Sequence, residues 1–417
     1  MSRTLSPYDA GVPHPAPDDA LAARFAALRE VRPAVSLDAV RDVVLLVSSS
    51  RGGSSMLTEI LRRVDGVLTL PGEVNPHVVV AQLTAVDGDV FLAELARDVG
   101  RPADGIPATD ELAADVHWRL TAQWPRSPLA AVDVRRWVEA AAAVADPRDT
   151  NAFTVAVLDR VAQAAPEVTA APYDLDGARG DPPPPCAPVV EMTPYVGFRS
   201  WRRPTADELA HSPLVIASPR NSYRLAWLGS LFPHARVRLL HLTRNPAASV
   251  NGLLDGWTSA AFFTTPVDVD LAITGYSDRI AAGRRWWKYD VPPHWRELTA
   301  ASLPQVAAAQ WQSAHAAVLD HIASTGIETL RVRYEDLVGD PVARERTAAE
   351  LAGFLGVDPA RMRAAVVDGV PPVMATAPPQ RRRWSASVHD LAPALGEPSL
   401  WETAAALGYG VEERLWI

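Results

Sequence analysis

Short runs of consecutive apolar residues mark four places along the chain where buried strands are expected. The first run, DVVLLV at 42–47, is β-branched and does not alternate with polar residues, which is typical of a parallel strand buried on both faces. Similar runs occur at 214–217, 237–242 and 328–333. Segments with helical spacing follow the first three runs. Strands that alternate with helices predict an α/β fold with a mainly parallel central sheet flanked by helices.

The rest of the chain predicts an extension and an insertion around this core. Residues 1–40 are expected to form an N-terminal extension of a proline-rich loop and a helix, and residues 41–417 a single domain. Within that domain, an insertion at about 78–190 begins with alanine-rich helices. It ends in a loop, because four consecutive prolines at 182–185 exclude a helix or a central strand.

Composition narrows the class of partner. The chain of 417 residues is 48% hydrophobic, and its net charge of -9 argues against nucleic acid or an anionic membrane as the partner. The single cysteine, Cys186, allows neither an internal disulfide nor a thiolate metal site. No signal-peptide pattern and no run of about 18 apolar residues is present, so we expect a cytoplasmic protein without a membrane segment.

A glycine-containing turn joins the first predicted strand to its helix. In the sequence SSSRGGSS, Gly52 and Gly53 let the backbone bend around an anion. The start of the helix offers free amide groups at Ser54 and Ser55, and Arg51 supplies a cation. The turn lacks the lysine and the opening glycine of the nucleotide triphosphatase loop. It predicts a phosphate cradle, with a simple turn carrying solvated serines as the alternative.

A second basic segment follows the third predicted strand. Arg244 comes directly after the strand, and Ser249 and Asn251 fall in the first turns of the next helix. A fixed guanidinium and a hydroxyl group there could hold a second phosphate. The alternative is a helix start with a surface arginine. Two anion sites at the carboxyl ends of parallel strands would face a common edge of the sheet.

In this order, the segments resemble the sulfotransferases that use 3'-phosphoadenosine-5'-phosphosulfate (PAPS), in their bacterial and Golgi-type branch. The resemblance implies a P-loop-like sulfotransferase fold with helical insertions. It implies that 49–57 binds the 5'-phosphosulfate and that 239–252 binds the 3'-phosphate. Two further segments, 218–235 and 330–341, are similar to the helix that leads to the second site and to a structural stretch of the family.

A late basic element completes the resemblance, and two positions depart from the family pattern. The resemblance implies that Arg382, Arg383 and Trp384 close over the nucleotide, whereas a solvated basic run is the alternative. Gly252 stands where the family often has serine, and Ala217 stands where many relatives have lysine. The second departure leaves the role of the nearby Arg220 open.

The resemblance implies an in-line transfer of a sulfuryl group from PAPS to a hydroxyl group, which needs no metal ion. Arg51 and the amides of its loop would stabilise the developing charge. Glu73, in the segment LPGEVNPH, is the candidate general base, because relatives place a glutamate there. His77 is the second candidate, since histidine titrates near neutrality. For both residues, a surface role without chemistry is the alternative.

The acceptor is the least determined part of the prediction. Of thirteen tryptophans, Trp257, Trp286, Trp287 and Trp295 crowd one region, which favours a bulky or aromatic small-molecule acceptor. Core packing is the alternative for each of them. Two other functions stay open, namely a catalytically silent nucleotide-binding module and a P-loop phosphotransferase. The oligomeric state is not predicted by any feature of the sequence.

Overall fold

The computed structural model describes most of the chain. The described residues are 19–31, 34–74, 77–78, 88–124, 127–166, 168, 200–217, 222–259, 264–370, 375–376, 378 and 380–410. Predictions for residues 1–18, for the prolines at 182–185 and for Arg220 lie outside these residues.

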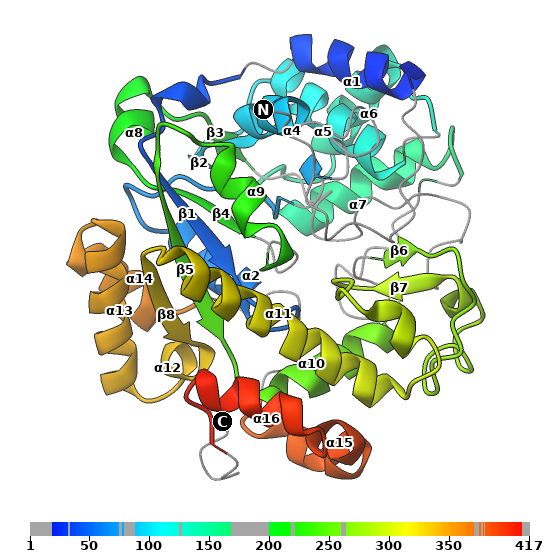
Figure 1. Cartoon of the computed structure of the whole chain (residues 1–417). Coiled ribbons are helices and arrows are strands. Elements are labelled where there is room, and N and C mark those ends of the chain that lie inside the picture. Colours follow the sequence, from blue (N-terminus) through cyan, green and yellow to red (C-terminus); the bar gives the residue numbers. More distant parts are fainter. Residues whose placement is uncertain are drawn as a thin grey trace.

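Four parallel strands form the central sheet, in the order β4-β1-β5-β8 (Figure 1). They confirm the four predicted strands and the α/β class with a parallel sheet flanked by helices. Strand β1 pairs with β5 along its whole length, from Asp42 opposite Arg236 to Val47 opposite His241. The loops that follow β1 and β5 therefore leave the same edge of the sheet side by side. The strand bounds are β1 Asp42–Val47, β4 Leu214–Ala217, β5 Arg236–Thr243 and β8 Thr329–Arg333.

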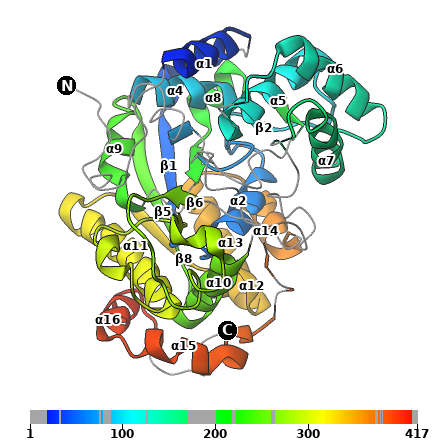
Figure 2. The same cartoon turned by 90° about the vertical axis from the view of Figure 1, so that its right-hand side faces the viewer.

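Helices cover both faces of the sheet, which explains the unbroken apolar run in β1 (Figures 1 and 2). Val43, Leu45 and Val47 pack in one core cluster with side chains of α4, α9 and α11. Val44 and Leu46 pack in the opposite cluster with α2, α13 and α14. The helix bounds are α2 Ser54–Arg62, α4 Gly88–Asp98, α9 Leu225–Ser230, α11 Leu303–Thr325, α13 Pro341–Leu355 and α14 Pro359–Asp368.

The helices predicted in the alanine-rich stretch are present, and they form a layer above the sheet in Figure 1 together with the N-terminal helix. Two short antiparallel pairs, β2 with β3 and β6 with β7, were missed by the sequence analysis because each strand has only two or three residues. The bounds are α1 Asp19–Val31, η2 Leu37–Ala39, β2 Arg101–Pro102, α5 Thr109–Gln123, α6 Ala131–Ala142, α7 Thr150–Val161, β3 Trp201–Arg202, α8 Ala206–His211, β6 Thr264–Pro266 and β7 Trp286–Lys288.

The C-terminal helices pack with α10 and α11 around a core rich in tryptophan. Trp257, Trp287 and Trp295 are at most 3% exposed and meet edge to face, with ring centroids 5.3 and 5.7 Å apart. Trp286 is 2% exposed. This burial favours core packing over the predicted acceptor pocket. The bounds are α10 Pro246–Thr258, η4 Ala281–Arg284, η5 Trp295–Leu298, α12 Tyr334–Val338, η6 Arg383–Ser387, α15 Val388–Leu395 and α16 Pro398–Ala406. Among the described helices, none combines the length and apolarity needed to cross a membrane.

Two histidines meet between the sheet and α11. His241 of β5 and His315 of α11 are fully buried, and Nε2 of His241 lies 2.9 Å from Nδ1 of His315. The other ring nitrogen of each residue is buried without a hydrogen-bond partner among the described residues. Burial lowers the pKa of both rings, and it lowers the pKa of His315 to about 3. Both imidazoles are therefore neutral in the fold.

This buried pair predicts a loss of stability in acid. In the unfolded chain a histidine takes up a proton near pH 6.5, so below that pH the unfolded state binds more protons than the fold. The free energy of unfolding therefore falls as the pH drops from about 6.5 toward 3. For His315 alone the loss between pH 6.5 and 5 is roughly 1.5–2 kcal/mol. Urea unfolding at both pH values measures it.

The variant His315→Gln removes one of the titrating groups, so the difference in stability between the two pH values should shrink by that amount. His294→Gln is the matched control, because the His294 side chain is 85% exposed. An unchanged pH dependence in His315→Gln would show that the buried pair does not control acid stability.

Candidate functional site

The loop between β1 and α2 has the form of an anion cradle. The Gly52 amide donates to the Ser49 carbonyl at 3.0 Å, which closes a tight turn. Arg51 and Gly53 both have a left-handed backbone, with φ of 63° and 97°. Helix α2 then begins at Ser54, and no side chain caps it. Its first amide groups are therefore available to a ligand.

The ring of Tyr334, at the start of α12, joins this loop to the loop after β5. A Cβ atom on Gly53 would lie 2.3 Å from Tyr334 Cδ2, so the ring rests directly on the glycine. The guanidinium of Arg244 lies 4.3 Å from the centroid of the same ring. Arg244 also donates a hydrogen bond from Nη1 to the Arg51 carbonyl at 3.3 Å. The two predicted anion-binding segments are thus brought together.

The Arg51 side chain reaches across to α10. Its Nε donates to the Gly252 carbonyl at 3.2 Å, and its Nη2 donates to Thr376 Oγ1 at 3.2 Å. A Cβ atom on Gly252 would lie only 3.3 Å from the Arg51 Cβ atom. Glycine at position 252 therefore allows Arg51 to approach the helix.

A third arginine lies in the same region. Arg383 forms an ion pair with Asp255 of α10, and Thr376 donates to the same carboxylate oxygen at 3.3 Å. Burial lowers the pKa of Arg244, and the positive charges of Arg51 and Arg383 lower it further. The arginines predicted from three separate segments therefore act on one another electrostatically, as expected of a site that receives an anion.

Buried polar atoms without partners line this region. Nε of Arg244 and the hydroxyl groups of Ser249 and Ser49 are buried and have no hydrogen-bond partner among the described residues. Ser249 and Ser49 are fully buried, and Asn251 is 4% exposed. A ligand bound between the two loops could accept or donate hydrogen bonds to these atoms.

Backbone strain is concentrated in the same part of the molecule. Among the described residues, Arg51, Tyr289 and Arg382 are the non-glycine residues with positive φ, at 63°, 64° and 52°. Burial raises the pKa of Tyr289, and the charge of Arg51 opposes this rise, which places the two residues near each other. Arg382 directly precedes Arg383. Strained backbone collects at functional sites because the surrounding structure must hold it.

Glu73 lies near the carboxyl end of β4. The amide of the next residue, Val74, donates to the carbonyl of Ala217, the last residue of β4, at 3.2 Å. Arg62 holds the preceding turn through hydrogen bonds to the carbonyls of Leu70 and Gly72 at 2.9 and 3.2 Å. The carboxylate is half-buried. Its assignment as the base stays a prediction.

His77 lies against the helical layer. Its Nε2 donates to Asp98 Oδ2 at 2.9 Å, and its ring centroid is 5.4 Å from that of Trp118. The side chain is 2% exposed. Its contacts are with α4 and α5 and not with the loops that carry Arg51 and Arg244, which favours a structural role.

The residues of the late basic element have two different roles: one forms an ion pair with α10, and another packs in the core. Trp384 is 2% exposed and belongs to the core cluster of α10 and α11, which favours packing over the predicted cover for adenine. The guanidinium of Arg382 lies 5.5 Å from the Trp384 ring centroid. Arg383 reaches α10 through an ion pair with Asp255.

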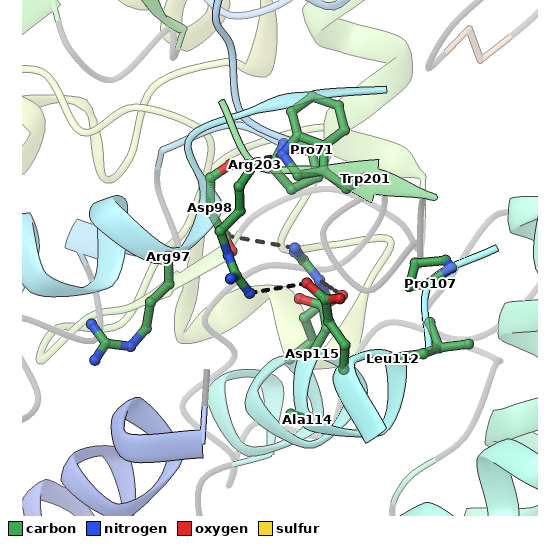
Figure 3. A pocket seen from close by; sticks show the side chains of 11 residues that line it. Pro71, Arg97, Asp98, Pro107, Leu112, Ala114, Asp115, Trp201 and Arg203 are labelled. Carbon is green, nitrogen blue, oxygen red and sulfur yellow. Dashed lines mark hydrogen bonds and ion pairs between the residues drawn. The ribbon is translucent and has the colours of Figure 1, made fainter. Parts of the chain in front are cut away.

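A pocket of about 60 Å³ opens between β3, α5 and the end of α4. Arg119 lies in it, 2.9 Å from Asp115 and 3.6 Å from Asp98, and Figure 3 shows Arg97 pointing away from these groups. Pro71, two residues before Glu73, also lines it. The sequence analysis recognised no motif here. Within the described part of the chain, no three His, Cys, Asp or Glu side chains gather to hold a metal ion.

The sequence analysis did not single out Tyr334, Ser50 and Asp290, nor Thr376 and Asp255, which contact the arginines. Tyr334 lay within a segment that the resemblance treated as structural. Ser50 donates a hydrogen bond to Asp290, and these residues are 3% and 1% exposed. The one available signal was the position of Ser50 inside the SSSRGGSS loop, because Asp290 lies 240 residues away in the sequence.

No protein-family model matches the chain, and neither does any curated protein. Three solved structures are similar to it. The sulfotransferase domain of the Synechococcus PCC 7002 olefin synthase is 15% identical, with a TM-score of 0.36, and covers 89% of this chain and 96% of its own. The sulfotransferase domain from the curacin biosynthetic pathway is 14% identical, with a TM-score of 0.36 and coverages of 89% and 99%.

A sulfotransferase from Alicyclobacillus acidocaldarius is 12% identical, with a TM-score of 0.33 and coverages of 89% and 98%. At these identities and TM-scores, the similarities do not assign the chain to a family. The function proposed below is therefore argued from the geometry of the site.

The contact between Gly53 and Tyr334 predicts the effect of a single added methyl group. Gly53→Ala should destabilise the protein by roughly 1–3 kcal/mol, because φ of 97° strains alanine and the methyl group collides with the ring. Gly105→Ala is the control, since a Cβ atom there meets nothing within 4 Å. Urea unfolding measures both. Equal stability of the two variants would contradict the packing of Tyr334 on the loop.

Proposed function

We propose that the chain is a sulfotransferase that moves the sulfuryl group of PAPS to a hydroxyl group of a small molecule. One observation carries this proposal. Unpartnered, buried hydrogen-bonding atoms occur on two loops at neighbouring strand ends, with Ser49 on one and Arg244 followed by Ser249 on the other. A ligand with two separate phosphate groups would satisfy both loops at once.

The residues fit such a nucleotide in two parts. The amide groups from Gly52 to Ser55, with Arg51, would hold the 5'-phosphosulfate at the start of α2. Arg244, Ser249 and Asn251 would hold the 3'-phosphate at the start of α10. When bound, PAPS supplies an activated sulfuryl group with a phosphate as its leaving group.

The charge of the site supports transfer of an anionic group. Arg51 is fixed between the Gly252 carbonyl and Thr376, so its cation is preorganised before the ligand arrives. Fixed cations and amides stabilise the negative charge that builds up on the leaving oxygen. The acceptor hydroxyl also needs a base, and Glu73 is the residue that the sequence predicts for this role.

A direct assay distinguishes this function from its two alternatives, the silent nucleotide-binding module and the phosphotransferase. The protein is mixed with PAPS and a panel of phenols and alcohols, and formation of the 3',5'-bisphosphorylated adenosine is followed. Product formation supports the sulfotransferase. Tight binding of the bisphosphate with no product from any acceptor favours a silent nucleotide-binding module, and magnesium-dependent turnover of nucleoside triphosphates favours a phosphotransferase.

Binding of the bisphosphorylated nucleotide tests the two-phosphate arrangement. Arg244→Ala should weaken the affinity roughly ten- to hundredfold, since it removes charge-assisted hydrogen bonds worth about 1.5–3 kcal/mol. Ser249→Ala should weaken it less, because a neutral hydroxyl contributes about 1 kcal/mol. Titration calorimetry measures both changes.

Arg361→Ala is the matched control, because the Arg361 side chain is 56% exposed and pairs with Asp65 on the surface. Its nucleotide affinity should equal that of the unmodified protein. If Arg244→Ala binds the nucleotide as tightly as this control does, the second phosphate is wrongly placed.

A further inference from the structure

A buried carboxylate contacts the loop that is proposed to bind an anion. The Ser50 hydroxyl, one residue before Arg51, donates to Asp290 Oδ1. Both side chains are at most 3% exposed. A carboxylate beside an anion site opposes binding, because like charges repel in a poorly hydrated environment. Its presence there calls for a chemical role.

The direction of this hydrogen bond limits what Ser50 can do. A hydroxyl group has a single proton, and here that proton is given to Asp290. The Ser50 oxygen can therefore only accept a further hydrogen bond. Sulfuryl and phosphate oxygens offer no proton at neutral pH, whereas the hydroxyl group of an acceptor does. Of the groups that react in the proposed transfer, the acceptor hydroxyl is the one that can donate to the Ser50 oxygen.

The surroundings fix Asp290 in place. Its carbonyl accepts hydrogen bonds from Gln310 Nε2 at 2.7 Å and from Trp287 Nε1 at 3.0 Å. The charge of Asp290 acts on the phenols of Tyr223 and Tyr289, whose pKa values are raised by burial first and by Asp290 in addition.

Other charged groups belong to the surroundings of Asp290. Lys288 donates from Nζ to the Gly256 carbonyl at 3.1 Å, and burial lowers its pKa to about 7. The charge of Arg51 lowers the pKa of Tyr289 and that of Asp255 raises it.

We propose that Ser50 accepts the proton of the acceptor hydroxyl and that Asp290, acting through Ser50, receives the proton that Ser50 gives up. This inference rests on the proposed sulfotransferase function and names a carboxylate other than Glu73 as the end of the proton path. Ser50 contacts the acceptor, and Asp290 is the positioning residue behind it.

The step balances without any further reagent. The acceptor oxygen forms a bond to sulfur while the bond between sulfur and the 5'-phosphate oxygen breaks, and that electron pair leaves on the nucleotide. The acceptor proton moves to the Ser50 oxygen as the Ser50 proton moves to Asp290. The donor charge favours the protonated carboxyl group, because it repels the carboxylate. Binding of the donor therefore raises the tendency of Asp290 to take up the proton.

The decisive variants are Asp290→Asn and Ser50→Ala. The asparagine amide still accepts the Ser50 hydrogen bond but takes up no proton, so kcat should fall at least a hundredfold. The affinity for the bisphosphorylated nucleotide should be unchanged or tighter, because a like charge is removed. The nucleotide affinity therefore distinguishes a role in proton transfer from structural damage, because structural damage would weaken binding. Ser50→Ala should lose kcat to a similar degree, and Ser50→Thr, which keeps the hydroxyl, should recover most of it.

Two comparison variants complete the experiment. Asp270→Asn makes the same change at a surface carboxylate that is 74% exposed and should leave both turnover and affinity unchanged. Glu73→Gln should lose less turnover than Asp290→Asn. In the pH profile of kcat, the acidic limb of the unmodified protein should be absent from the residual activity of Asp290→Asn.

Three results would overturn the inference. Turnover of Asp290→Asn and Ser50→Ala within threefold of the control would exclude the path through Ser50. A larger loss in Glu73→Gln than in Asp290→Asn would return the role of base to Glu73. Weaker nucleotide binding by Asp290→Asn would make Asp290 a support of the loop. Failure of the unmodified protein to bind the nucleotide is a different result, because it refutes the sulfotransferase function itself.

Discussion

The pairing of β1 with β5 places the two basic loops side by side, and the ring of Tyr334 packs between them. Tyr334 lies against Gly53 on the loop after β1 and under the Arg244 guanidinium on the loop after β5. A guanidinium over an aromatic face is attracted by the ring, and burial strengthens this attraction because water does not compete. The fold thereby keeps two cationic segments side by side although their charges repel.

Polar contacts fix the residues around the arginines. Glu335 accepts hydrogen bonds from the Asn245 amide and side chain at 2.9 Å, so this buried carboxylate holds the corner of the loop. Arg51 donates hydrogen bonds to a carbonyl and to a hydroxyl group. Unpaired buried atoms and strained backbone cost stability. A bound anion would offset that cost, which links the stability of the site to its ligand.

The two sides of the site also carry opposite charges. Arginines gather where α10 meets the loop after β1, whereas Asp290 approaches the same loop through Ser50. In the proposed reaction, the cations would suit the anionic donor, and a proton acceptor would suit the hydroxyl group that attacks it. The aromatic side chains near Asp290 pack in the hydrophobic core. They therefore make this side of the site rigid and contribute little to its surface.

The apolar runs and the spacing of Arg51, Gly52 and Gly53 determined the parallel strands, the order of loops and helices, and the basic character of the site. These features are local, because strand burial and turn geometry depend on neighbouring residues in the chain. Tyr334, Thr376 and Asp290 meet the SSSRGGSS loop from distant parts of the sequence, so only tertiary packing could show their contacts. The burial of Trp384 and His77 was likewise decided by the helices that pack around them. Periodicity tells which side chains face inward, but it does not tell which of them meet.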